Sequence, residues 1–291
     1  MIVGFPPGGP NDLIARILGA KLADLLKAAV VIENRPGSNS EIAAALVAKA
    51  TPDGYTLLFG STGALAVSPS LQVKLAYDPR RDFSPVALVA SNPMLLVVRQ
   101  GLAANSVKEL IALARAQPGR LNYASAGAGS PTHLAAALFT SMATIDAVHV
   151  PYKGGGPALV DLIAGQVDFY FGGLSTALPH AKAGRLRALG ITSRGRSAAA
   201  PAVPSINEAG LADYEATIWY GVLAPARTPP QVIAQLESAS IEAVRAPDVR
   251  ARLVEQGADP LEMKSEQFAG FIQSEIVKWA AMVKATGATA D

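Results

Sequence analysis

Residues 150–174, VPYKGGGPALVDLIAGQVDFYFGGL, decide the fold of this chain. An apolar strand ends at Val150 and runs into the glycine loop 151–157, and Pro157 then opens a helix that Gly165 closes. A second apolar run, 167–171, ends in another small loop, 172–176. This order of strand, small loop, helix and strand is typical of α/β proteins.

The same alternation extends over the whole chain. Strands are predicted at 2–5, 29–33, 55–60, 86–90, 94–98, 121–125, 147–150, 167–171, 188–192 and 218–224. They are continuously apolar rather than alternating, which is typical of strands buried on both faces. The helix predicted at 12–27 carries its Leu and Ile residues on one stripe. The pattern predicts an α/β fold with mainly parallel sheets.

Local signals mark several helix starts. Ser106 and Glu109 have the spacing of a capping box, and Thr228 is expected to cap a helix that has proline in its first turn. From 231 to about 286 the chain is predicted to be almost entirely helical, without a strand of its own. This helical part must pack against sheets made earlier in the chain.

Two segments are expected to cross between domains. Residues 99–105 separate a strand from a new helix, and residues 209–226 return the chain through an extended, aromatic-bearing segment. Two crossings predict a discontinuous first domain, residues 1–99 plus 220–291, around a second domain, residues 100–219. The alternative is one continuous doubly wound domain with a helical tail.

Composition excludes several classes of protein. Of 291 residues, 50% are hydrophobic and 16% are charged, which excludes a disordered chain. The net charge is only +2 and the sequence contains no cluster of Lys and Arg, so no nucleic-acid partner is expected. The longest apolar run, residues 42–48, is too short to span a membrane. The absence of cysteine fits an oxidising compartment. No signal peptide is visible, and we expect that one has been removed or trimmed.

Small loops follow five of the predicted strands. They lie at 6–12, 61–63, 126–133, 151–157 and 172–176, and most of them open helices. Glycine lets backbone approach a ligand closely, and the first N–H groups of a helix lack internal partners and attract anions. Ligands of open α/β sheets bind at these strand ends. Five such loops together predict an anion site, although any one alone could be a simple turn.

Familiar catalytic and cofactor motifs are absent. No Gly-Lys dipeptide occurs, so there is no P-loop, and 127–132 lacks the third glycine of a dinucleotide fingerprint. There is no G-x-S-x-G elbow, and no pair of histidines has metal-ligand spacing. Neither a cofactor nor a metal is expected.

Each single polar residue near these loops could have a structural role or a role at the ligand. We expect Asp12 to cap the first helix, His133 to be a hydrogen-bonding residue at a helix start, and His149 to be buried. Asp168 is expected to pin a loop, with a role at the ligand left open. Lys153 is equally compatible with a ligand contact and with solvent exposure.

Longer stretches of the sequence resemble one family. These are IVGFPPGGPND at 2–12, VVIENRPG at 30–37, ATPDGYTLLFG at 50–60, YDPRRDFSPVALVA at 77–90, SAGAGSPTHLAAALF at 125–139 and the stretch 150–174. Weaker matches are VPSINEAG at 203–210 and WYGVLAPARTPP at 219–230. The chain resembles, over essentially its full length, the Bug-type extracytoplasmic solute receptors, the substrate-binding component of tripartite tricarboxylate transporters.

The resemblance implies a type II-like periplasmic binding protein with two α/β domains, two hinge crossings and a ligand closed between the domains. Family ligands are small carboxylates: di- and tricarboxylates, acidic amino acids and aromatic acids. The implied partners are this ligand and the membrane permease subunits of the transporter. A monomeric, periplasmic protein that captures its ligand by hinge closure is expected.

Carried over from the family, the ligand is gripped by loops of both domains. The implied ligand-binding residues are Phe5, Pro7, Gly8, Gly9, Asn11, Ser61, Thr62, Ala64, Gly127, Gly129, Ser130, Thr132, Lys153, Gly154, Gly155, Gly173 and Thr176. Asp12, His133 and Asp168 are expected to support them. Asn11 stands where the family more often has Thr or Ser, and the 61–64 loop is smaller than many, which bears on the distal ligand group.

Two other functions stay open at this point. An enzyme on a similar scaffold would act on a small acid, with His133 or Asp168 as its acid or base. A ligand-sensing subunit of a signalling system would use the same binding loops.

Overall fold

The computed structural model describes residues 1–71 and 74–286, and the chain divides into two compact units. Unit 1 comprises Met1–Ser91 and Ile218–Ala281, and unit 2 comprises Asn92–Thr217 and the described residues 282–286. Strand β4 (Phe83–Arg99) begins in unit 1 and ends in unit 2, so the first division falls inside a strand rather than at 99–105. The second division falls at the start of β9 (Thr217–Pro225).

Unit 1 contains a mixed sheet. Its strand order is β2 (Glu33–Asn34), β1 (Ile2–Val3), β3 (Leu58–Ser61), β9 and β4, with β10 (Asp259–Lys264) also paired to β4. Strand β1 is parallel to β2 and β3, whereas β9 is antiparallel to β3 and β10 is antiparallel to β4. The expected mainly parallel arrangement is wrong, because later segments of the chain enter the sheet in the opposite direction.

The C-terminal part does contain a strand. Its β10 sequence, DPLEMK, alternates charged and apolar residues and is only partly buried, so it lacks the apolar run by which the other strands were predicted. The prediction of a strand-free C-terminal part is therefore wrong.

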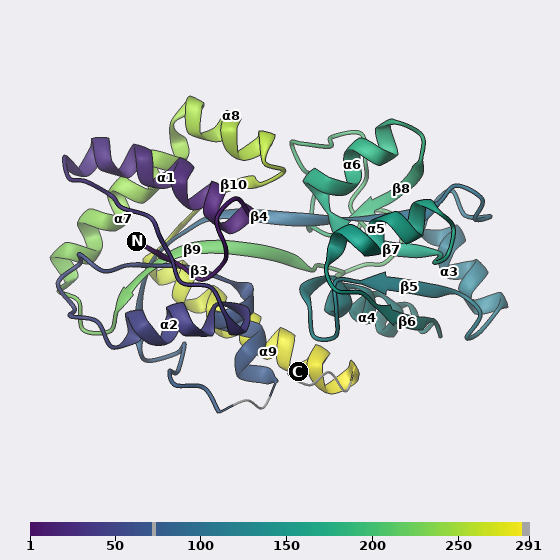
Figure 1. Ribbon diagram of the computed structural model, residues 1–291, viewed down its shortest axis with the longest axis horizontal. Helices are drawn as coiled ribbons and strands as arrows, with labels where there is room; N and C mark the ends of the chain where they lie inside the picture. The colour runs from purple at the N-terminus through teal and green to yellow at the C-terminus, as the bar shows by residue number, and fades with distance from the viewer. Residues whose placement is uncertain (72–73, 287–291) are drawn as a thin grey trace. The chain divides into compact units, whose positions relative to one another are not determined.

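Helices cover both faces of the unit 1 sheet. One face carries α1 (Pro10–Leu26), α7 (Pro230–Arg245) and α8 (Pro247–Glu255), which lie together in Figure 1. Helices α2 (Glu41–Ala48) and α9 (Ser265–Thr286) complete the unit, and α9 extends past its boundary.

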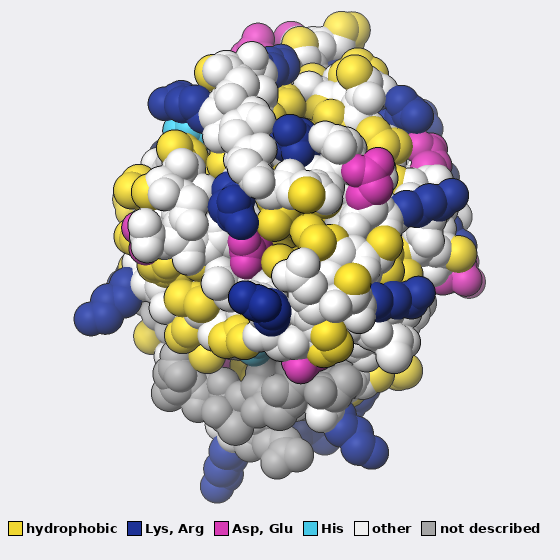
Figure 2. Space-filling model, turned by 90° about the vertical axis from the view of Figure 1, so that its right-hand side faces the viewer, with side chains coloured by type: hydrophobic (Ala, Val, Ile, Leu, Met, Phe, Trp, Pro, Cys, Tyr) yellow, Lys and Arg dark blue, Asp and Glu magenta, His cyan; other side chains and the backbone are white. Residues whose placement is uncertain are grey.

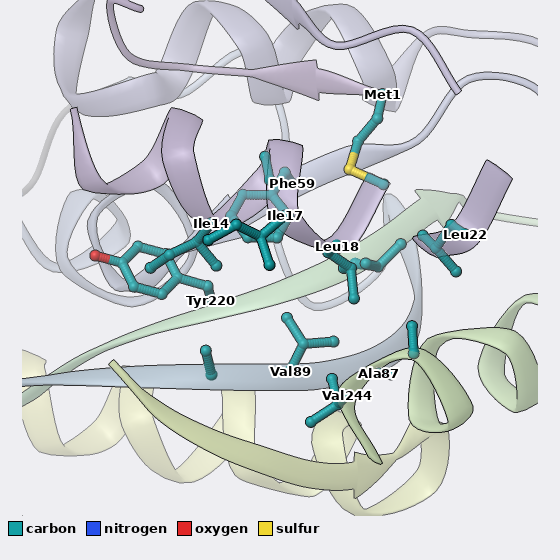
Figure 3. Close-up of a cluster of buried hydrophobic side chains, with 14 of the residues drawn as sticks. Met1, Ile14, Ile17, Leu18, Leu22, Phe59, Ala87, Val89, Tyr220 and Val244 are labelled. Carbon is teal, nitrogen blue, oxygen red and sulfur yellow. The ribbon is translucent and has the colours of Figure 1, made fainter. Parts of the chain in front are cut away.

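Strand β9 supplies alternate side chains to the two faces of its sheet. Tyr220 and Val222 belong to the core beneath α1, where the Tyr220 ring stacks on that of Phe59 with centroids 5.9 Å apart (Figure 3). Trp219 points the other way and packs edge-on against Phe268 and Phe271 of α9. The alternation explains why β9 reads as continuously apolar.

Unit 2 repeats this layered design. Its sheet has the order β4, β7 (Phe169–Gly173), β5 (Asn122–Ser125) and β6 (Val148–Pro151), and β8 (Leu186–Ile191) also pairs with β4. Strand β5 is parallel to β6 and β7, and β4 is antiparallel to β7 and β8. The helices are α3 (Val107–Ala116), α4 (Pro131–Ala143), α5 (Gly155–Ile163) and α6 (Leu174–Lys182).

The centre of the unit 2 sheet is buried on both faces, as predicted from its apolar runs, whereas β6 is only partly buried. Leu96 and Val98 of β4 lie in a cluster with side chains of α3 and α4. Leu95 and Val97, which point the opposite way, lie in a cluster with side chains of α5 and α6. Successive residues 95–98 of β4 therefore pack against different helices, and all of them are apolar.

Several strands differ in length from the expectation, and two of these differences have a clear physical reason. The strands predicted at 86–90 and 94–98 are one strand, because β4 pairs with β10 as far as Ser91 and with β7 from Met94 on. Pro93 lies where the ladder changes partner, a position that tolerates a missing N–H. Strand β2 is shorter than predicted because its partner β1 has only two residues.

Two helix starts differ as well. Ser106 accepts a hydrogen bond from the Glu109 N–H as the capping box requires, but Glu109 reaches back to the Asn105 N–H. Thr228 does not cap α7: its hydroxyl donates to the Pro225 carbonyl, and Pro229 is the cap residue.

Candidate functional site

Three loops of unit 1 follow parallel strands and lie along one edge of its sheet. The carboxyl ends of β1, β2 and β3 meet there, so loops 5–11, 35–40 and 61–64 are neighbours. Ser40 touches the Cα region of Gly4, and Asn39 touches that of Gly63. The sequence predicts binding roles for the first and third loops but not for loop 35–40.

Loop 35–40 has an unusual backbone. Ser38, Asn39 and Ser40 all have positive φ (44°, 50° and 77°), which non-glycine residues rarely adopt. The Ser40 hydroxyl is buried and has no hydrogen-bond partner among residues 1–71 and 74–286. Such backbone persists only where packing imposes it. The Pro36-Gly37 pair, followed by small polar residues, is the sequence signal that could have marked this loop.

Asp12 organises loop 5–11 rather than capping the helix. The cap residue of α1 is Gly9, and Asp12 lies in the first turn, buried. Its carboxylate accepts hydrogen bonds from the Gly8 N–H (2.9 Å), from Arg16 Nε (2.9 Å) and from Asn34 Nδ2 (2.9 Å). These donors, with Arg16 the strongest, lower the pKa of Asp12 to about 2. The Gly8 amide is therefore engaged inside the protein.

Residues 61–64 are buried, and two of them are held by other parts of unit 1. The Thr62 hydroxyl accepts from the Trp219 N–H (2.8 Å), and the Ala64 carbonyl accepts from the Tyr77 hydroxyl (2.7 Å). Ser61 is 2% exposed. This loop is thus fixed by hydrogen bonds to distant residues of the same unit.

The segments predicted as loops in unit 2 lie at the carboxyl ends of β6, β5 and β7, which are parallel neighbours. The prediction of a loop at 172–176 is wrong, because β7 runs to Gly173 and α6 begins directly at Leu174. The Gly154 N–H donates to the Ala126 carbonyl (3.2 Å), which joins loop 153–156 to loop 127–132. A methyl group placed on Gly155 would lie 2.8 Å from the Tyr170 hydroxyl of β7. The structure therefore brings together the unit 2 residues expected at the site.

Side chains hold loop 127–132 closed on itself. The Ser130 hydroxyl donates to the Gly127 carbonyl (2.7 Å) and caps α4 by accepting from the His133 N–H (3.3 Å). The Thr132 hydroxyl accepts from the Ala126 N–H (2.8 Å). Ser130 and Thr132 shape this loop through these internal bonds.

Three helices at these edges have glycine as their cap residue and therefore no side-chain cap. These residues are Gly9 of α1, Gly154 of α5 and Gly173 of α6. The N–H groups of an uncapped first turn have no partner within the helix and carry a partial positive charge. Thr176, in the first turn of α6, is exposed and donates to the Gly173 carbonyl (2.9 Å). Each unit thus offers helix N-termini suited to a carboxylate.

Lys153 is exposed beside the α5 N-terminus, and within the described residues it forms no ion pair. On the face drawn in Figure 2, the Lys and Arg side chains are spread out, with Asp and Glu between some of them, instead of gathered in one patch.

His133 and His149 stack on each other beneath loop 127–132, with ring centroids 3.9 Å apart and planes 7° apart. Tyr123 of β5 stacks on the His149 ring. His149 is half-buried, not buried as expected. Burial, and then the neighbouring His133, lower the pKa of His149 to about 4, and burial lowers the pKa of His133.

Asp168 lies away from the loops. It precedes β7 and accepts from the Asn122 N–H at the start of β5 (2.9 Å), so it marks the amino ends of these strands. Its other oxygen pairs with Arg99 Nε (2.9 Å). The structure does not bring Asp168 together with the expected ligand-binding residues.

Residues 1–71 and 74–286 contain no cluster of three or more His, Asp or Glu side chains placed to hold a metal. No helix within these ranges combines the length and the apolar character needed to cross a membrane.

The chain is similar to known proteins over its whole length. Residues 14–288 match the tripartite tricarboxylate transporter family receptor. Protein BugT of Bordetella pertussis is 40% identical over 289 residues, covering 99% of this chain and 89% of BugT.

Two solved structures are similar in both sequence and fold. Rpa4515 of R. palustris with adipate is 34% identical, with a TM-score of 0.82 over 99% of this chain and 97% of the other. MatC of Rhodopseudomonas palustris with bound malate is 36% identical, with a TM-score of 0.77 over 97% of each chain. Together with the layers of both units, these matches show the α/β periplasmic-binding-protein fold.

Proposed function

The chain belongs to the tripartite tricarboxylate transporter receptor family, and from that premise we propose that it captures a small carboxylate in the periplasm and delivers it to membrane permease subunits. Two relatives that are more than 30% identical were solved with adipate and with malate, both dicarboxylates. A small dicarboxylate is therefore the first ligand class to test.

The observation that carries the proposal is the set of uncapped helix N-termini at strand ends in both units. Helix α1 supplies one in unit 1, and α5 and α6 supply two in unit 2. One helix terminus contributes about 0.3–2 kcal/mol, and hydrogen bonds to a charged group contribute about 1.5–3 kcal/mol each. Several such donors acting on one carboxylate would give useful affinity without a buried cation.

In the proposed mechanism, loops of both units bind the same ligand. The ligand then favours the conformation in which both sets of donors reach it, which is hinge closure by population shift. We assign the contacts to loops 5–11 and 61–64 in unit 1 and to 127–132, 153–156 and 173–176 in unit 2. Loop 35–40 supports the first two by its packing on Gly4 and Gly63.

We also propose that the protein acts as a monomer and without catalysis. The two groups considered as acid or base are engaged elsewhere, since His133 Nδ1 accepts from the Gly129 N–H and Asp168 pairs with Arg99. Conversion of a bound acid into product would contradict this part of the proposal.

Thermal stabilisation by a panel of acids tests the function. The protein would be unfolded, washed and refolded to remove carried ligand, then melted with mono-, di- and tricarboxylates at fixed pH and ionic strength. A ligand present at about 100 times its Kd adds roughly 2.7 kcal/mol, which raises the Tm by on the order of 5 °C. The diamide of the best acid is the matched control and should give no shift. If no acid shifts the Tm of a cooperatively folded sample, the carboxylate proposal is wrong.

Lys153 tests the assignment of a single loop. Replacing it by methionine removes the cation beside α5, and we expect Kd for the stabilising acid to rise about three- to tenfold. Lys182→Met is the matched control, because Lys182 is also exposed but lies at the far end of α6. Equal affinity of the two variants for the acid in calorimetric titration would show that Lys153 does not contact the ligand.

A further inference from the structure

The stacked pair of His133 and His149 belongs to two different elements. His133 lies in the first turn of α4, and His149 lies on β6. Both rings face loop 127–132 from within unit 2, and Tyr123 of β5 completes the stack, with its centroid 5.1 Å from that of His149.

Each histidine is joined to the loop by hydrogen bonds. His133 Nδ1 accepts from the Gly129 N–H (3.1 Å). His149 Nε2 lies 2.6 Å from the Ser125 hydroxyl, and that oxygen also accepts from the Gly127 N–H (3.1 Å). The two glycine amides of the loop are thus fixed by one histidine directly and by the other through Ser125.

We propose that His133 and His149 are positioning residues that keep loop 127–132 in its ligand-binding conformation while both rings are neutral, so that acidification weakens carboxylate binding beyond the effect of the acid's own titration. The inference rests on the proposed function, because it assigns ligand contact to this loop.

The hydrogen bond at His133 requires a neutral ring, whereas His149 Nε2 can either donate to or accept from the Ser125 hydroxyl. A protonated His133 carries a hydrogen on Nδ1 and can no longer accept from Gly129. Two cationic rings at 3.9 Å would also repel each other strongly in partly buried surroundings.

Nothing around the pair favours a positive charge. The titratable group that faces it from β5 is Tyr123, whose own pKa burial raises to about 12. The polar groups near the pair are the hydroxyls of Ser125 on β5, Ser130 in the loop and Thr132 on α4. No carboxylate forms an ion pair with either ring among the described residues. Protonation therefore has no local compensation, and the pKa of both rings is lowered.

Two replacements of His133 distinguish the contribution of its ring stacking from that of its hydrogen bond to Gly129. Asparagine places an oxygen acceptor near the position of Nδ1, whereas phenylalanine keeps a stacking ring and removes the acceptor. We expect His133→Phe to raise Kd for the stabilising acid about tenfold at pH 7.5, and His133→Asn to restore most of the affinity. Equal affinity of His133→Phe and the wild type would overturn the proposal.

The pH profile adds a measurement that a merely structural role would not move. The wild type and the double variant His133→Asn/His149→Gln would be titrated with the same acid from pH 7.5 to 4.0. Titration of the acid affects both proteins equally, so the ratio of their Kd values isolates the rings. We expect the wild type to lose about threefold or more relative to the double variant. Parallel profiles would overturn the proposal.

Failures of the two proposals are distinguishable. A folded wild type that binds none of the acids contradicts the proposed function itself, whereas binding that is insensitive to these variants contradicts only the role of the histidines. If His133→Phe does not fold, Ser125→Ala carries the test, because it keeps both rings and cuts the link from His149 to Gly127. Wild-type affinity of a folded Ser125→Ala protein would then overturn the inference.

Discussion

At the scale of single residues, polar side chains fix the conformation of the proposed binding loops by hydrogen bonds to their backbone. Asp12 collects three donors around loop 5–11, and Ser130 and Thr132 close loop 127–132. Several loop amides are engaged in this way, so the uncapped first turns are expected to supply a large share of the donors to the ligand. Internal hydrogen bonds thus hold the backbone of these loops in place.

Asp12 is expected to stabilise unit 1 above acidic pH. Its pKa in the folded protein is about 2, against an ordinary value of 3.8, so its contribution is present above pH 3.8 and is lost as pH falls toward 2. Asp12→Asn should lower the free energy of unfolding by about 2 kcal/mol at pH 7, and the difference should shrink near pH 2. Urea unfolding followed by tryptophan fluorescence measures this, since Trp219 and Trp279 both lie in unit 1.

The matched control is Asp24→Asn, because Asp24 lies exposed on the same helix. It should change stability by less than about 0.5 kcal/mol. Equal effects of the two substitutions would mean that the buried hydrogen bonds of Asp12 add nothing.

Two adjacent glycines of α5 should respond to alanine with opposite signs. A methyl group on Gly155 meets the Tyr170 hydroxyl at 2.8 Å, whereas one on Gly156 meets nothing within 4 Å. We expect Gly155→Ala to lower the Tm, because the buried Tyr170 ring has little room to move. Gly156→Ala should raise stability by about 0.4–1 kcal/mol by restricting the unfolded chain. Calorimetric melting of both variants decides this, and a Gly155→Ala protein as stable as the wild type would contradict the close approach.

At the scale of elements, α9 is attached to β9 through a buried carboxylate. Glu275 Oε2 accepts from Trp219 Nε1 (2.8 Å) and from Trp279 Nε1 (2.9 Å), and Lys278 pairs with its other oxygen. One acidic side chain thus satisfies two indole N–H groups in an otherwise apolar layer.

Removing that acceptor should be costly. Glu275→Leu leaves two buried N–H groups without a partner, so we expect a loss of about 2–4 kcal/mol in the free energy of unfolding. Glu275→Gln retains an oxygen acceptor and should lose less. Urea unfolding and the tryptophan emission maximum report on both variants, and equal losses would show that the charge matters rather than the acceptor.

At the scale of the whole molecule, the two units should differ in their response to acid. His149, in unit 2, has a folded pKa of about 4 against an ordinary value of 6.5, so the unfolded state binds its proton first. Stability of unit 2 should therefore fall as pH drops from 6.5 to 4, by about 3 kcal/mol at most for this residue. His149→Gln should flatten the dependence in that window.

Hydrogen exchange of the β5 and β6 amides reports on the unfolding of unit 2, while tryptophan fluorescence reports on the unfolding of unit 1. The expected result is a steeper pH dependence of exchange in the wild type than in His149→Gln between pH 6.5 and 4. Identical slopes would contradict the assigned pKa.

The sequence by itself determined the α/β layers, the small residues that follow five of the strands, and the family. These depend on local features: apolar runs of strand length, helical stripes, and glycines placed after strands. The apolar runs of β4 and β7 could be read in this way because each residue is buried on one face or the other.

Only the tertiary structure decided how these pieces pair. The antiparallel entry of β9 and β10, the unbroken β4, the packing of loop 35–40 and the stacking of His133 on His149 all join residues far apart in the chain. Strand direction and side-chain contacts of this kind depend on how distant segments meet, and a local pattern contains no information about its distant partner. For the same reason Asp12, predicted as a cap, acts instead through Gly8, Arg16 and Asn34, the last of which reaches it from another strand.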